Sequence, residues 1–166
     1  ALAQMLYEGI EIPGHGHVGL ITYMRTDSTR ISDEMIKQVR PYIERVYGKD
    51  YLPPKPNVYA RGKDSQDAHE AIRPTNLQFA PNMLAAVLSR DQLRLYTLIW
   101  NRFLASQMVP QISQATNAVL QSGIYTLRAT GTQVLFDGFT VLRTVKEKKQ
   151  DNEELPLLPA LHKGHT

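Results

Sequence analysis

Apolar residues recur at helical spacing in three stretches of the chain, the first of them at residues 2–6. The second stretch begins at Ser32, carries acids in its first turn and runs to Gly48, while Pro41 inside it predicts a kink or a split. The third follows the capping-box sequence of residues 89–92. Its apolar face, which we interpret as core, consists of Leu93, Tyr96, Ile99, Trp100, Phe103 and Leu104.

The remaining segments have irregular or extended patterns. Residues 9–19 hold glycine, proline and histidine and predict a loop, whereas residues 18–24 are rich in β-formers and predict a short strand. Residues 49–68 predict a loop long enough to suggest function, and residues 146–154 predict a solvated charged loop. Antiparallel strands separated by glycine-bearing turns are predicted at 118–121, 124–129, 134–136 and 139–142.

Together these elements predict an α+β fold in two parts. We expect a mainly helical domain over residues 1–108, incomplete at its N-terminus, and β strands of a neighbouring domain over residues 109–166. Both ends resemble cuts in a longer polypeptide, because the chain starts inside a helix without a cap and stops just after a turn.

The composition is that of a globular protein, with 42% hydrophobic and 21% charged residues. No run approaches the roughly 20 apolar residues of a membrane span, and no secretory leader is seen, so we expect a cytoplasmic protein without membrane contact. The absence of cysteine excludes disulfides and thiolate metal sites. A net charge of +3 permits a polyanionic partner without requiring one.

One candidate site follows the predicted strand, where Tyr23, Arg25 and Asp27 alternate and would share a face if the strand continued. A phenol is a poor nucleophile unless a base, metal or cation assists it, and an arginine can grip a phosphodiester with two donors. Asp27 could orient Arg25 or cap the next helix. Hydroxyl donors suited to phosphate follow at Thr26, Ser28 and Thr29. The alternative, favoured on spacing alone, is a core strand that ends in a helix-entry turn.

A second cluster, at residues 67–75, places His69, Glu70 and Arg73 close together after the long loop. On a helical turn, His69 and Arg73 would share a face and could bind a phosphate or pass a proton to a leaving hydroxyl. The alternative is a salt network of acid, histidine and arginine that braces the loop, and for the cluster taken singly this is the more common arrangement.

These two clusters carry a resemblance to the bacterial type IA DNA topoisomerases, the topoisomerase I family. The tyrosine motif, GLITYMRTDSTRIS at residues 19–32, resembles the family's active-site tyrosine motif. The second motif, DAHEAIRPT at residues 67–75, resembles another signature of the family at a similar interval. Residues 95–108 and 136–139 agree as well, so the resemblance covers essentially the whole chain.

The resemblance implies that Tyr23 attacks a phosphodiester of single-stranded DNA, retains the 5′ phosphate covalently and releases a 3′ hydroxyl. Arg25 would steady the scissile phosphate, and His69 would contact it or assist proton transfer. Supporting or DNA-contacting roles would fall to Thr26, Asp27, Ser28, Glu70 and Arg73. Strand passage and religation without ATP would relax negative supercoils. We therefore expect single-stranded and negatively supercoiled DNA as partners and a nucleoid-associated location.

The family also uses a Mg²⁺-binding Toprim domain with an Asp-x-Asp pair, a pattern that this sequence lacks. Because metal-held oxygens speed phosphoryl transfer, we expect Mg²⁺ as a cofactor held elsewhere in the full-length enzyme and no metal site in this chain. The chain alone is expected to be inactive. The remainder of the same polypeptide is its expected partner, and the whole is expected to be a monomer.

The sequence also allows two other interpretations. His15 and His17 resemble the metal-binding pair of tyrosine nicking endonucleases, but those pairs are separated by a bulky apolar residue and precede a tyrosine on a later helix. His162 and His165 resemble a ligand pair by spacing alone. A non-catalytic single-strand binding module would instead form its groove from Arg25, Arg30, Arg61, Lys63 and Arg73.

Overall fold

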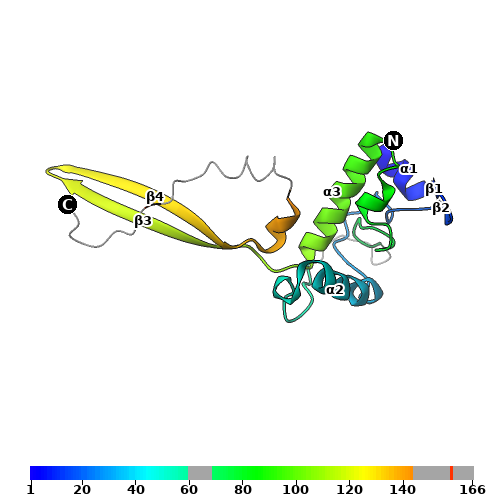
Figure 1. The fold of residues 1–166 in the computed structure, drawn as a ribbon, viewed down its shortest axis with the longest axis horizontal. Coiled ribbons are helices and arrows are strands. Elements are labelled where there is room, and N and C mark those ends of the chain that lie inside the picture. The colour runs from blue at the N-terminus through cyan, green and yellow to red at the C-terminus, as the bar shows by residue number, and fades with distance from the viewer. Residues whose placement is uncertain (60–68, 144–157, 159–166) are drawn as a thin grey trace. The chain divides into compact units, whose positions relative to one another are not determined.

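The computed structural model describes residues 1–59, 69–143 and 158, and the chain divides into two compact units, residues 1–109 and 110–166 (Figure 1). Three α-helices and two antiparallel two-stranded sheets make up the regular structure of the described residues, which confirms the α+β class. Within these ranges no helix is both long and apolar enough to cross a bilayer.

The helices of the first unit are α1 (Leu2–Glu8), α2 (Asp33–Tyr47) and α3 (Arg90–Ser106). A split of α2 at Pro41 was one predicted outcome, and it is wrong because the helix continues through that residue. Val39 and Ile43 lie on either side of Pro41 and are both fully buried. Packing of both halves into one core compensates for the hydrogen bond that proline cannot make.

Helix α3 confirms the predicted capping box. The Ser89 hydroxyl accepts a hydrogen bond from the Gln92 amide, and the Gln92 side chain accepts one from the Ser89 amide. Tyr96 is fully buried, and its hydroxyl donates to the carbonyl of Phe79 at 2.8 Å. Desolvation raises the pKa of the Tyr96 phenol well above its ordinary value. The core of this unit includes Leu6, Leu20, Ile21, Val39, Ile43, Leu84, Tyr96, Trp100, Phe103 and Leu104.

The predicted loop at residues 9–19 is instead a short hairpin, in which β1 (Ile10–Ile12) pairs with β2 (Gly16–Val18). The predicted strand at 18–24 is wrong beyond Val18, because residues 19–24 form only one isolated bridge, between Ile21 and Pro74. The ladder ends there because neighbouring amides bond elsewhere: the Arg73 amide donates to the Thr22 hydroxyl and the Leu20 amide donates to the Leu6 carbonyl. Two short 3₁₀ helices, η1 (Lys49–Tyr51) and η2 (Pro81–Leu84), complete the unit.

The second unit is a long antiparallel hairpin of β3 (Ile112–Ser122) and β4 (Tyr125–Phe136), followed by the 3₁₀ helix η3 (Gly138–Leu142). The four predicted strands are therefore corrected to two. Gly131, expected in a turn, stays in the ladder opposite Thr116. Residues 139–142 leave the sheet because Gly138 adopts a φ of 49°, and a side chain there would collide with the Pro110 carbonyl. The predicted charged loop at 146–154 lies outside the described residues.

Side chains of this hairpin are exposed along nearly its whole length. The turn at its tip uses Gly123 in the left-handed region, with a φ of 58°. The large apolar side chains exposed on the two strands and their turn are Ile112, Val119, Leu120, Ile124, Tyr125, Leu127, Val134 and Leu135.

Candidate active site

The tyrosine motif and the second motif lie side by side, and the residues of the second motif to which the Thr22 hydroxyl bonds are 49 and 51 positions from it in the sequence. The Thr22 amide donates to the carbonyl of Arg73 at 2.9 Å, and the Thr75 amide donates to the carbonyl of Leu20 at 3.1 Å. The Thr75 hydroxyl adds a bond to the carbonyl of Gly19 at 2.6 Å. These bonds fix residues 19–22 antiparallel to residues 73–75, immediately before Tyr23.

Thr22 reinforces this pairing through its side chain. Its hydroxyl donates to the carbonyl of Ala71 at 2.7 Å and accepts from the amide of Arg73 at 2.9 Å. A hydroxyl can do both at once because it carries one hydrogen and two lone pairs. The residue before the candidate nucleophile therefore holds the backbone of the second motif from two directions.

Tyr23 stands at this junction with 37% of its surface exposed. The His69 ring lies 5.6 Å from the Tyr23 ring between centroids, at an interplanar angle of 39°. On the same phenol, the ring of Tyr7 from α1 makes an edge contact at 5.4 Å and 66°. An exposed phenol with an imidazole ring beside it offers the two groups from which a nucleophile and its proton acceptor could be built.

Arg25 and Asp27 follow Tyr23 in irregular backbone, so the predicted strand does not carry them. Exposure nevertheless alternates from residue 22 to residue 30, and Tyr23, Arg25 and Asp27 all fall among the exposed positions. Neither Arg25 nor Asp27 forms an ion pair with any residue whose position the structure describes. No described carboxylate therefore competes with an anion for the guanidinium of Arg25.

Thr26 and Ser28 organise the turn that follows. The Ser28 amide donates to the Thr26 hydroxyl at 3.0 Å, and the Arg30 amide donates to the Ser28 hydroxyl at 3.2 Å. Each hydroxyl acts here as an acceptor, which leaves its own hydrogen free to donate. Two O–H donors and Arg25 thus follow the tyrosine within five residues.

Arg73 has a different environment, with only 9% of its surface exposed. Its Nε and Nη2 donate to one Glu70 carboxylate oxygen at 2.8 and 2.6 Å, and its Nη1 donates to the Pro74 carbonyl at 2.8 Å. Arg30 lies 3.8 Å from the other oxygen of Glu70. The Arg73 guanidinium thus braces the loop internally. This agrees with the interpretation of the cluster as a salt network.

The helical turn that would have placed His69 and Arg73 on one face is absent, since residues 69–73 are irregular. The backbone bonds to residues 20 and 22 hold this segment extended instead. As a result, His69 meets Tyr23 while Arg73 turns inward to Glu70. Asp67, the first residue of the second motif, lies outside the described residues.

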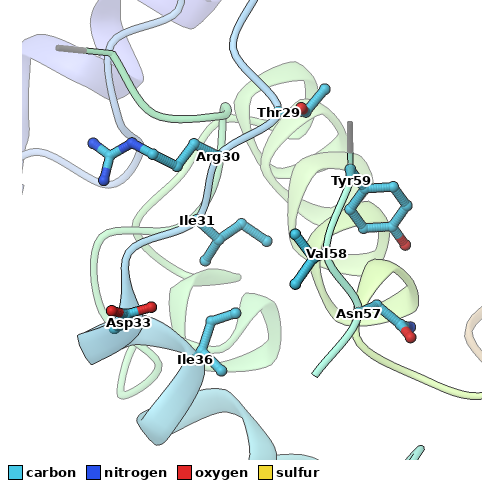
Figure 2. A pocket seen from close by; sticks show the side chains of 8 residues that line it. All are labelled: Thr29, Arg30, Ile31, Asp33, Ile36, Asn57, Val58 and Tyr59. Atoms are coloured by element: carbon cyan, nitrogen blue, oxygen red, sulfur yellow. The ribbon is translucent and has the colours of Figure 1, made fainter. Parts of the chain in front are cut away.

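A cavity of about 310 Å³ lies beside the segment that follows the tyrosine motif's turn (Figure 2). Its lining consists of Thr29, Arg30, Ile31, Asp33, Ile36, Asn57, Val58 and Tyr59, and Tyr23 and His69 are not among these residues. The amide of Asn57 and the hydroxyl of Tyr59 already donate to the carbonyl of Ser106. In Figure 2 the Arg30 guanidinium extends away from Val58 and Tyr59. Among the described residues that line the cavity, none directs a cation at its interior.

Metal ligands do not assemble in the described part of the chain, which contains no group of three or more histidine or acidic side chains. His17 lies 3.9 Å from Glu11, and His15 packs edge-on against Phe79 at 5.1 Å between ring centroids. His162 and His165 lie outside the described residues. The described side chains therefore do not fit a Mg²⁺ site of their own.

Two residues of this site, Tyr7 and Thr22, were not identified from the sequence. Tyr7 belongs to the first helix, outside the motif that it contacts. A weak signal existed for Thr22, which directly precedes the candidate nucleophile and is β-branched in a segment of extended pattern. Nothing in the spacing distinguished its hydroxyl from the others nearby.

Comparison with known proteins gives consistent matches. Residues 1–166 match a family model described as DNA topoisomerase. The chain is 50% identical over 139 residues to DNA topoisomerase 1 of Campylobacter jejuni, covering 83% of this chain and 20% of that protein. With DNA topoisomerase 1 of Xylella fastidiosa it shares 45% identity over 168 residues, covering 98% of this chain and 21% of the relative.

Among solved structures, full-length topoisomerase I from Thermotoga maritima matches with a TM-score of 0.77 and 39% identity. The match covers 99% of this chain and 25% of that structure. The chain thus spans about a fifth to a quarter of the length of the relatives that it matches.

Proposed function

Because the chain belongs to the DNA topoisomerase family, as a segment of a bacterial type IA topoisomerase I, we propose that Tyr23 is the nucleophile that cleaves one DNA strand. The observation that carries the proposal is the pairing of the two motifs, which brings His69 against the exposed ring of Tyr23. Each motif taken alone can be explained by structural roles. Because both motifs contribute side chains around the Tyr23 phenol, we favour a catalytic role over a structural one.

In the proposed reaction, the Tyr23 oxygen attacks phosphorus and the bond from phosphorus to the 3′ oxygen breaks. The phenol loses its proton and the departing 3′ oxygen gains one, so a group that can exchange protons is needed beside the reacting atoms. His69 is the described side chain best placed for this exchange. Religation reverses the step, and the phosphotyrosine link conserves the energy of the broken bond, so ATP is not required.

Some of the neighbouring residues would contact the DNA, and others would support the residues that do. Arg25 would bind the scissile phosphate, with Thr26 and Ser28 as hydroxyl donors, because these groups have donors to offer. Asp27 is exposed and would orient Arg25 when DNA is bound. Glu70 and Arg73 differ from these residues, because they already hydrogen-bond to each other and Arg73 also donates to the Pro74 carbonyl. We assign this pair a supporting role beneath the site.

A complete reaction would require the rest of the polypeptide. The proposed Mg²⁺ would be held by another domain of the full-length enzyme, since the described residues offer no ligand cluster. We propose that the isolated chain neither cleaves nor relaxes DNA. The proposed partners are single-stranded and negatively supercoiled DNA, which would place a monomeric enzyme at the nucleoid.

The test uses the complete polypeptide and a single-stranded oligonucleotide labelled at its 3′ end, because the proposed adduct keeps the downstream fragment. Wild type should yield a labelled covalent adduct that maps to Tyr23, and Tyr23→Phe should yield none. DNA affinity should stay within about twofold, since the ring that stacks is unchanged. An adduct formed by Tyr23→Phe would assign the chemistry to another residue.

A non-catalytic single-strand binding module remains the second candidate function, favoured by the exposed Arg25 and the exposed aromatic rings. The same variant separates the two. If Tyr23→Phe lowers binding as much as any measured turnover, the Tyr23 hydroxyl acts as a DNA-binding contact and the nucleophile assignment is wrong.

A further inference from the structure

The last turn of helix α1 is hydrogen-bonded to the tyrosine motif. The Leu20 amide donates to the carbonyl of Leu6 at 2.7 Å, and both of these side chains are fully buried. Gly19 lies so close to the helix that an added Cβ would be 2.7 Å from the carbonyl oxygen of Tyr7. The backbone of Tyr7 is therefore held at a fixed distance from the motif.

This attachment places the Tyr7 ring edge-on against the ring of Tyr23, at 5.4 Å between centroids. His69 borders the same ring at 5.6 Å. Tyr23 thus touches one aromatic ring from α1 and another from the second motif. A phenol that is 37% exposed would otherwise be free to change rotamer, and its hydroxyl would move with it.

We propose that Tyr7 is a positioning residue for the nucleophile, acting through its ring. This rests on the proposed function of Tyr23. Edge-to-face aromatic contacts favour one arrangement by roughly two- to tenfold in population. Tyr7 therefore raises the fraction of enzyme in which the Tyr23 hydroxyl points toward the strand to be cut.

An exposed tyrosine can also serve as a stacking platform for an unpaired base. The structure favours positioning, because the Tyr7 ring already packs on Tyr23 and its backbone is locked by contact with Gly19. Base stacking is the competing outcome in the test.

The test compares Tyr7→Ala, Tyr7→Phe and a matched control, Leu2→Ala, in the complete polypeptide. Leu2 also lies on α1, with 38% exposure. The measurements are the single-turnover cleavage rate at saturating single-stranded oligonucleotide, the Kd for that oligonucleotide in a Tyr23→Phe background, and the thermal midpoint.

We expect Tyr7→Ala to slow cleavage by about three- to tenfold with a Kd within about twofold of the parent. Its thermal midpoint should match that of Leu2→Ala, which should cleave at the wild-type rate. Tyr7→Phe should restore the rate, because the ring and not the hydroxyl makes the contact.

Three results would overturn the inference: an unchanged rate in Tyr7→Ala, a Kd that rises by the same factor as the rate falls, or a Tyr7→Phe variant as slow as Tyr7→Ala. The second result would assign Tyr7 to base stacking and the third would assign a role to its hydroxyl. If even the wild type forms no adduct at Tyr23, the proposed function fails instead, and the two failures are thereby distinguished.

Discussion

Removing the carboxylate of Glu70 should destabilise the first unit by about 2 kcal/mol. The change Glu70→Gln keeps the shape of the side chain and removes its charge. The Arg73 side chain is only 11% exposed, and the substitution removes the carboxylate that accepts two short hydrogen bonds from its guanidinium. Breaking a fully buried ion pair from one side costs about 3–5 kcal/mol. Glu70 itself is 21% exposed, so water recovers part of that cost.

Trp100 provides the assay. It is the single tryptophan of the chain, it is 3% exposed, and it lies in the same unit as the ion pair. Urea unfolding followed by its fluorescence should show a lower midpoint with an unchanged slope. A loss of about 2 kcal/mol corresponds to roughly a 30-fold change in the unfolding equilibrium constant.

Glu11→Gln is the matched control, because Glu11 faces His17 at 3.9 Å and is 76% exposed. Exposed pairs contribute about 0–1 kcal/mol, so this variant should unfold close to the wild type. If Glu70→Gln is no more destabilised than Glu11→Gln, the Glu70–Arg73 pair is energetically a surface pair and the support assigned to it is wrong.

Three other perturbations test the packing around the site. Thr22→Val removes a hydroxyl that is bonded twice to the second motif, and it should lower the free energy of unfolding by about 1–3 kcal/mol in the same urea titration, whereas Thr22→Ser should lose less. Gly19→Ala should lower the thermal midpoint by calorimetry and the single-turnover cleavage rate of the complete polypeptide, since the new methyl group meets the Tyr7 carbonyl; wild-type values for both would show that the backbone yields. Because the folded state keeps the proton of Tyr96 at a pH at which the unfolded chain releases it, the free energy of unfolding should fall as the pH rises above 10.0, and Tyr96→Phe should flatten that slope.

Local signals in the sequence predicted the helices well. The Ser89 capping box and the apolar face through Tyr96 and Trp100 are confirmed, because caps and 3.6-residue periodicity act over a few neighbouring residues. Family membership also followed from the two motifs and is confirmed. The catalytic and supporting roles of individual residues remain predictions.

Errors arose where distant partners decide the outcome. The β-forming residues at 18–24 predicted a strand, yet the Arg73 and Leu20 amides donate to the Thr22 hydroxyl and the Leu6 carbonyl, so only one isolated bridge forms. The inward turn of Arg73 depends on Glu70, which draws it away from His69. Tyr7 was missed because its contact with Tyr23 requires the fold that brings α1 against Gly19. Such contacts leave no periodic trace in the sequence.

The backbone pairing of residues 19–22 with residues 73–75 has one more consequence, for local opening of the native state. The amides of Thr22 and Thr75 belong to a single short ladder. We therefore expect both amide hydrogens to exchange with solvent only when residues 19–22 separate from residues 73–75. Because Tyr23 and His69 adjoin the two segments of this ladder, we expect its local opening to separate the phenol from the imidazole.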